Sequence, residues 1–310
     1  MAVEKPSAKS FVDPQTLMRI RNLELRARIV VQGFWNGLHR SPYHGFSVEF
    51  TEYRQYTPGD DPRYVDWKLF ARCDRHYLRK FEDETNLRCQ LLVDASRSMG
   101  YGSISYTKGD YANTLGATLA HFLSKQGDAV GVLTFDEGVR DYLPARNRPG
   151  HLRHLMLALE KATAGTSTDL IAPLTRAVEL TRRRALMVLI SDLLAPVERL
   201  ESSLAALSAC GHETVVFHVL DPAEMDFNFD KASLFLDVET GREIYIDPVA
   251  ARKEYLCQFT AHNAGIESTC RKLGASYHRL LTNRPLELAL FDFMRGRMQR
   301  GKLVRRNTLR

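Results

Sequence analysis

The sequence has few cysteines and no long hydrophobic run, and these two shortages exclude several classes of protein. Its 310 residues include 5 cysteines, an odd number without a CxxC pair, which argues against a zinc ribbon or a disulfide scaffold. The longest apolar stretch runs from Ala185 to Ile190, far short of the roughly 20 residues of a membrane-spanning helix. Residues 1–13 lack the apolar core of a secretory signal. We therefore expect a soluble cytoplasmic protein with reduced thiols.

Acidic residues are missing from one end of the chain, and this local shortage explains the basic net charge. The net charge is +6, but residues 293–310 carry seven basic residues and no acidic one. Subtracting those seven charges leaves −1 for residues 1–292. We therefore expect a nearly neutral folded body with a basic tail. Specific nucleic-acid binding is not expected, whereas peripheral contact of the tail with an anionic membrane stays open.

Hydrophobic periodicity predicts an α/β fold. An amphipathic helix is expected from Pro14 to about Leu38, packed on its own domain. Further along, apolar runs alternate with helical patterns, which is typical of a mainly parallel sheet with helices on both faces. Strands are predicted at 91–93, 129–135, 139–143, 186–190, 214–220 and 276–280, helices at 108–125, 150–161, 170–183, 197–209, 248–273 and 285–298, and a hairpin at 233–246.

Oxygen-bearing side chains follow the predicted strands at the points where ligands usually bind in such sheets. Asp94, Ser96 and Ser98 form a DxSxS pattern after the first strand, and Asp192 follows the strand 186–190. Thr168 lies in a loop before a predicted helix. Two carboxylates and three hydroxyls suit Mg²⁺ or Mn²⁺ rather than zinc. We expect such a hydroxyl-rich site to bind its metal weakly.

These five residues resemble the metal-ion-dependent adhesion site (MIDAS) of von Willebrand factor A domains, in the same order and the same structural context. The resemblance covers about residues 90–281. It implies a Rossmann-like domain that binds a divalent cation. It also implies that the cation holds an acidic group of a protein partner.

A dense polar and aromatic motif lies upstream of that domain. Residues 46–56 alternate as a strand does and lead into a turn-rich segment. The motif reads Arg54-x-Tyr56-x-Pro58-Gly59-Asp60-Asp61-x-Arg63-x-x-Asp66-Trp67-x-x-x-Ala71-Arg72. It resembles the signature of the bacterial domain of unknown function 58 family, whose members often occur beside MoxR-type AAA+ ATPases. The residues of the motif that could form an ion-pair network, or else a docking surface or second ion site, are Arg54, Tyr56, Gly59, Asp60, Asp61, Arg63, Asp66, Trp67 and Arg72.

These patterns predict four parts of the chain. Residues 1–45 hold a tail and the amphipathic helix, residues 46–88 form a β-rich segment, residues 89–284 form the von Willebrand factor A-like domain, and residues 285–310 form a helix with a basic tail. We expect a non-enzymatic, metal-dependent adaptor that works with a MoxR-type AAA+ ATPase or its client. The alternative is a metal-dependent phosphatase or nuclease that uses the same oxygen ligands.

Overall fold

The computed structural model describes residues 11–40, 53–55, 77–79, 87–161, 170–229, 233–236 and 243–307. The chain divides into two compact units, one of Met1–Gly37 with Leu87–Arg310 and one of Leu38–Asn86. The first unit therefore contains the N-terminal helices, the main sheet and the C-terminal helix together. The four-part division expected from the sequence stays a prediction.

The smaller unit contributes two short strands. β1 (Tyr53–Gln55) pairs antiparallel with β2 (Tyr77–Arg79), with Arg54 opposite Leu78. Of the predicted strand 46–56, these three residues alone fall in the described part of the chain. Most of the upstream motif lies outside the described residues: Tyr56, Gly59, Asp60, Asp61, Arg63, Asp66, Trp67 and Arg72.

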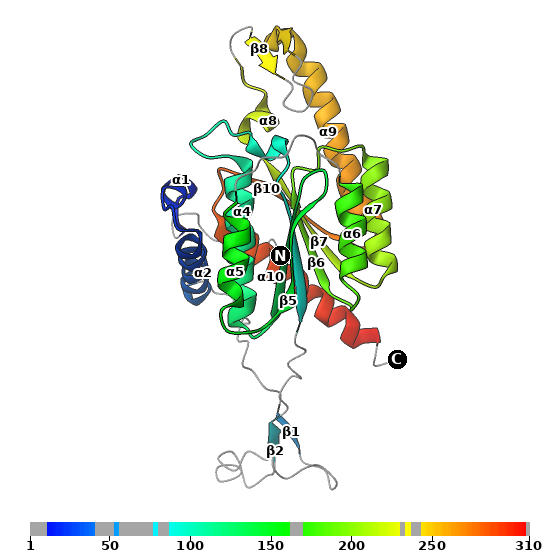
Figure 1. The fold of residues 1–310 in the computed structure, drawn as a ribbon. Coiled ribbons are helices and arrows are strands. Elements are labelled where there is room, and N and C mark those ends of the chain that lie inside the picture. Colours follow the sequence, from blue (N-terminus) through cyan, green and yellow to red (C-terminus); the bar gives the residue numbers. More distant parts are fainter. Residues whose placement is uncertain are drawn as a thin grey trace. The chain divides into compact units, whose positions relative to one another are not determined.

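The larger unit is built on a six-stranded sheet, shown in Figure 1, with the order β10-β7-β6-β3-β4-β5. All neighbours pair in parallel except β5, which runs antiparallel to β4. The predicted α/β, Rossmann-like fold is confirmed, because a mainly parallel sheet lies between helices. The strands are β3 (Arg88–Asp94), β4 (Ala129–Phe135), β5 (Val139–Arg146), β6 (Leu186–Ser191), β7 (Glu213–Leu220) and β10 (Ser276–Leu281).

Helices cover both faces of this sheet (Figure 1). One face carries α4 (Lys108–Lys125), α5 (His151–Leu159) and α10 (Leu286–Asn307). The other face carries α6 (Ile171–Leu180), α7 (Val197–Ala209) and α9 (Pro248–Lys272). Apolar side chains of the sheet and of this second set of helices form a continuous core, which includes Leu92, Leu174, Leu204, Val216 and Ile266.

The N-terminal segment packs on the larger unit as two helices instead of the single helix expected from the sequence. α1 (Pro14–Met18) is followed by α2 (Leu23–Arg40). The break has a local cause, because the Asn22 side chain accepts a hydrogen bond from the Leu25 backbone N–H at 2.8 Å and so caps a new helix. The expected packing is confirmed: Leu23 and Phe34 are buried.

Close approach of α2 to the C-terminal helix depends on an aromatic cluster and a glycine. The Phe34 ring lies 5.5 Å from Phe122 of α4 and 4.7 Å from Phe291 of α10, measured between centroids. A Cβ atom at Gly33 would stand 2.8 Å from the Glu287 carboxylate. α10 itself continues to Asn307, so the helix end that the sequence predicted near Met298 is wrong.

Three smaller elements surround the sheet. A 3₁₀ helix η3 (Arg97–Gly100) follows β3, and α8 (Pro222–Asp226) follows β7. The sequence predicted neither, since single helical turns leave almost no periodic pattern. The predicted hairpin is present as β8 (Ser233–Leu236), paired antiparallel with β9 (Glu243–Ile246).

Candidate functional site

The carboxyl ends of three neighbouring strands bring acidic residues to one edge of the sheet. Asp94 is the last residue of β3, Asp192 follows β6 and Asp221 follows β7. Parallel strands all end at the same edge, and β3, β6 and β7 are adjacent. All three carboxylates are buried, so their charges need compensation from nearby groups.

The loop after β3 turns the DxSxS residues toward one another. The Ser96 backbone N–H donates to Asp94 Oδ1 at 2.8 Å, which holds the start of the loop. Ser96 is the N-cap of η3, and Ser98 lies within that short helix. The Ser96 and Ser98 hydroxyl oxygens consequently lie 3.1 Å apart and share a hydrogen bond.

The surroundings of Asp94 disfavour its charged form. Burial and then repulsion from Asp192 raise its pKa to about 7. The Ser191 hydroxyl opposes this by donating to Asp94 Oδ2 at 2.5 Å. A bound cation would relieve the remaining repulsion, because it stabilises the charged form of both acids.

Asp192 is held from two sides. Its Oδ2 accepts a hydrogen bond from Lys108 Nζ at 2.8 Å, and its backbone carbonyl lies 2.8 Å from His218 Nε2. His218 Nδ1 in turn lies 2.8 Å from the Tyr277 hydroxyl. Burial lowers the pKa of His218 to about 4, although Asp192 opposes this shift. The imidazole is thus neutral at physiological pH and supports the backbone of the site.

Lys108 is a functional candidate that the sequence did not reveal. It is the first residue of α4, and its ammonium group also contacts Glu224 Oε1 of α8 at 2.6 Å. Its side chain is fully buried. The one local signal is its position, because a cation at a helix N-terminus opposes the helix dipole and so needs another reason to be there.

The predicted metal ligands are only partly covered by the structure. Asp94, Ser96, Ser98 and Asp192 are brought together at the strand ends, whereas Thr168 lies outside the described residues. Within the described ranges, no group of three or more His, Cys, Asp or Glu side chains is arranged to hold a metal. A cation at this edge would therefore depend on serine hydroxyls as well as on carboxylates.

The donor set fits a small hard cation. Magnesium is bound octahedrally with metal–oxygen distances near 2.0–2.1 Å, so neighbouring ligand oxygens lie about 2.9 Å apart. The Ser96 and Ser98 oxygens, 3.1 Å apart, are close to this spacing. Oxygen donors alone, with no sulfur or imidazole nitrogen among them, also favour Mg²⁺ or Mn²⁺.

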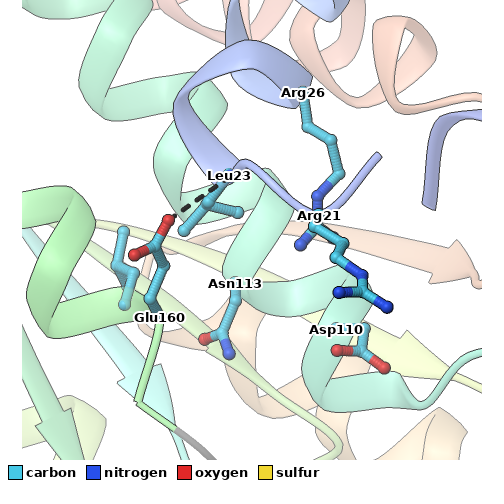
Figure 2. A pocket seen from close by; sticks show the side chains of 7 residues that line it. Arg21, Leu23, Arg26, Asp110, Asn113 and Glu160 are labelled. Carbon is cyan, nitrogen blue, oxygen red and sulfur yellow. Dashed lines mark hydrogen bonds between the residues drawn. The ribbon is translucent and has the colours of Figure 1, made fainter. Parts of the chain in front are cut away.

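A hollow lies away from the strand ends, among α2, α4 and α5 (Figure 2). It has a volume of about 300 Å³. Arg21 and Arg26 line it together with the acids Asp110 and Glu160. Glu160 also accepts a hydrogen bond from the Leu23 backbone N–H at 3.4 Å. Two positive and two negative groups balance, so the hollow favours no ligand of one charge, and we assign the candidate site to the strand ends.

No helix in the described part of the chain is long and apolar enough to cross a membrane.

Among solved structures, similarity is remote. An aerotolerance-related membrane protein from Bacteroides fragilis is 17% identical with a TM-score of 0.46, over 66% of this chain and 96% of that one. The SpRpn10 VWA domain is 11% identical with a TM-score of 0.40, over 66% of this chain and 93% of that one.

Sequence relatives are closer. Uncharacterized proteins of Mycobacterium bovis and Mycobacterium tuberculosis are 32% identical over 298 residues, which is 94% of this chain and 92% of each relative. Residues 52–265 match the family described as "Protein of unknown function DUF58". The chain belongs to this DUF58 family, as its upstream motif predicted.

Proposed function

We propose that this protein is a non-enzymatic adaptor that binds a divalent cation at a MIDAS-like site and uses it to hold a partner protein. The VWA-like fold and the DUF58 family suggest a protein-interaction domain. Asp94, Ser96, Ser98 and Asp192, with Thr168, would hold the ion. When bound, Mg²⁺ or Mn²⁺ supplies an open coordination position for a carboxylate oxygen of the partner.

The observation that carries this proposal is that the two serine hydroxyls converge beside Asp94, a buried carboxylate whose charged form is disfavoured. Ser96 and Ser98 lie at octahedral ligand spacing, and the pKa of Asp94 is raised by burial and by Asp192. An ion would fill a position that already has oxygen donors and surplus negative charge. Ser191 and the Ser96 backbone N–H orient Asp94, so the Asp94 side chain itself would need little reorganisation before binding.

We further propose that the partner is a MoxR-type AAA+ ATPase or a client of that machine, in the cytoplasm. This extends the resemblance of the upstream motif to proteins found beside such ATPases. The chain has no G-x-x-x-x-G-K-[ST] loop, so ATP hydrolysis would come from the partner. Buried thiols such as Cys89 and Cys270 agree with a reducing compartment.

A hydrolase using the same ligands would need a general base beside the ion. Among the described residues, His218 contacts Asp192 directly, and both of its ring nitrogens are engaged, one with the Asp192 carbonyl and one with the Tyr277 hydroxyl. The lowered pKa of His218, about 4, also makes it a weak base. His262 is engaged with the Leu193 carbonyl at 3.2 Å. The adaptor is therefore the better-supported function. Mg²⁺-dependent phosphatase or nuclease activity that disappears in Asp192→Ala would reverse this preference.

The direct test is metal binding by the full chain. Titration calorimetry with Mg²⁺ and Mn²⁺ is expected to show one site, weakened at least tenfold in Asp94→Ala and in Ser98→Ala. Ser202→Ala removes an exposed hydroxyl from α7 and serves as the matched control with wild-type affinity. Partner capture from the native cell should be lost with chelator and in Asp94→Ala. Equal metal affinity in wild type and a folded Asp94→Ala variant would refute the site.

A further inference from the structure

Lys108 places a positive charge inside the candidate metal site. Its Nζ atom lies 2.8 Å from Asp192 Oδ2 and 2.6 Å from Glu224 Oε1, and 5.8 Å from the centroid of the Tyr101 ring. Its side chain has no solvent exposure. The ammonium group therefore lies on the same carboxylate that a metal ion would use.

Burial of this ammonium group costs free energy that its acidic partners must offset. An ammonium group loses its favourable hydration when it is buried, and the N-terminus of α4 repels it. Carboxylate oxygens of Asp192 and Glu224 lie 2.8 Å and 2.6 Å from Nζ, so two charge-assisted hydrogen bonds offset the lost hydration. The ammonium form is thus retained through its two acidic partners.

The two partners differ in their surroundings. Asp192 directly follows β6 and is fully buried, whereas Glu224 belongs to α8 and its side chain is 16% exposed. Glu224 Oε2 accepts a hydrogen bond from the Asp221 backbone N–H at 2.8 Å. Its backbone carbonyl accepts one from the Tyr255 hydroxyl of α9 at 3.0 Å. Lys108 therefore links a predicted metal ligand to α8 and α9.

Building on the proposed metal site, we propose that Lys108 is a tethered competitor of the divalent cation. Without metal, its ammonium group neutralises Asp192. Metal binding takes Asp192 away from Lys108 and leaves the ammonium group with Glu224 alone. Metal binding thereby changes the contact between Lys108 and Glu224 of α8. Competition from the lysine also keeps the affinity for metal low.

The competition predicts that substitutions of Lys108 and of Glu224 have opposite effects on Mg²⁺ affinity. Lys108→Met keeps an unbranched side chain that is one atom shorter but removes the charge, so Asp192 is free for metal. We expect Mg²⁺ affinity to rise at least about tenfold, since a charge-assisted hydrogen bond no longer has to be broken. Glu224→Gln leaves Lys108 dependent on Asp192, and we expect it to weaken Mg²⁺ binding.

A double-substitution cycle separates this mechanism from simple charge effects. In Lys108→Met/Glu224→Gln, the effect of Glu224→Gln should vanish, because Glu224 acts through the lysine. A general loss of negative charge would instead weaken binding equally in both backgrounds. Lys125→Met removes the same charge from the exposed far end of α4 and is the matched control.

The measurement is calorimetric Mg²⁺ titration of the full chain, with melting temperatures in Mg²⁺ and in chelator. Lys108→Met removes the ammonium group from buried Asp192 and from Glu224 and can fail to fold. The double variant, purified in Mg²⁺, then carries the comparison with wild type and should bind at least as tightly as wild type. If wild type binds metal and Lys108→Met binds equally or more weakly, the lysine orients Asp192 and the competition is wrong, while the metal site stands. If neither binds, both proposals fail.

Discussion

At the scale of single residues, the candidate site depends on keeping Asp94 ionised in a buried place. Burial and Asp192 favour the protonated form, whereas Ser191 and the Ser96 backbone N–H favour the charged form. This balance leaves the metal-free site poised, because neither form is strongly preferred near neutral pH. Ionised Asp94 therefore costs stability in this buried position, a cost that the proposed cation would offset.

The stability of the metal-free protein should fall as pH rises through the range in which Asp94 ionises. Its pKa is raised from 3.8 to about 7 on folding, so the folded state binds more protons than the unfolded state between these values. The contribution is favourable below pH 4 and is lost by about pH 7. At pH 8, Asp94→Asn should raise the free energy of unfolding by up to about 4 kcal/mol.

Urea denaturation in chelator at pH 5 and pH 8 measures this effect. Asp292→Asn changes an exposed acid on α10 and should leave the pH dependence as in wild type. Adding Mg²⁺ at pH 8 should stabilise wild type but not Asp94→Asn. A wild-type protein that becomes steadily more stable from pH 5 to pH 8 in chelator would contradict the assignment.

At the scale of elements, the N-terminal helix α2 is part of the main unit and not an appendage. Phe34 packs edge-on against Phe122 of α4 and close to Phe291 of α10. It is fully buried, as are Ala27 and Val30 on the same face. α2 thus joins the helix that begins at Lys108 to the C-terminal helix, and its loss should loosen both.

Truncation of the central residue of this packing should be expensive. Phe34→Ala is expected to cost about 3–5 kcal/mol of unfolding free energy, because it removes buried apolar area and leaves a cavity beside the Phe122 and Phe291 rings. Leu25→Ala on the same helix is the control, since Leu25 is 44% exposed and should cost less than about 0.5 kcal/mol. Chemical denaturation of the full chain gives both values. Similar costs for the two variants would mean that α2 does not contribute to the core.

At the scale of the whole molecule, positive charge is concentrated on the last helix. Residues 293–310 carry seven basic residues and no acid, and residues 1–292 have a net charge of −1. Because α10 continues to Asn307, most of these charges are held on a helix and not on a tail. The basic isoelectric point, about 9.1, therefore describes one element.

Any attraction of the chain to anionic surfaces should come from this helix. We expect binding to phosphatidylserine vesicles at low salt that weakens as salt rises, because each basic side chain near the surface contributes about 1 kcal/mol. Replacing Arg300, Lys302, Arg305 and Arg306 by Gln should reduce binding more than tenfold in a sedimentation assay. The exposed cluster Arg182, Arg183 and Arg184, changed in the same way, is the control. An equal loss in both variants would disprove a special role for α10.

Periodicity in the sequence was enough to predict the sheet and its main helices. The predicted helix 108–125 matches α4, and the predicted strand 129–135 matches β4. The sequences of these elements have long, regular apolar patterns, and such patterns predict the type of element. The short helices η3 and α8, and the break between α1 and α2, were missed because single turns and side-chain caps leave little periodic signal.

For the candidate site, the sequence alone determined which oxygen ligands follow which strands, because parallel strands deliver their carboxyl ends to one edge. The placement of Asp94, Ser96, Ser98 and Asp192 follows from that rule. Only the tertiary structure decided that Lys108 contacts both Asp192 and Glu224. The physical reason is distance along the chain: contacts between residues 84 and 116 positions apart arise from packing, on which local sequence pattern carries no information.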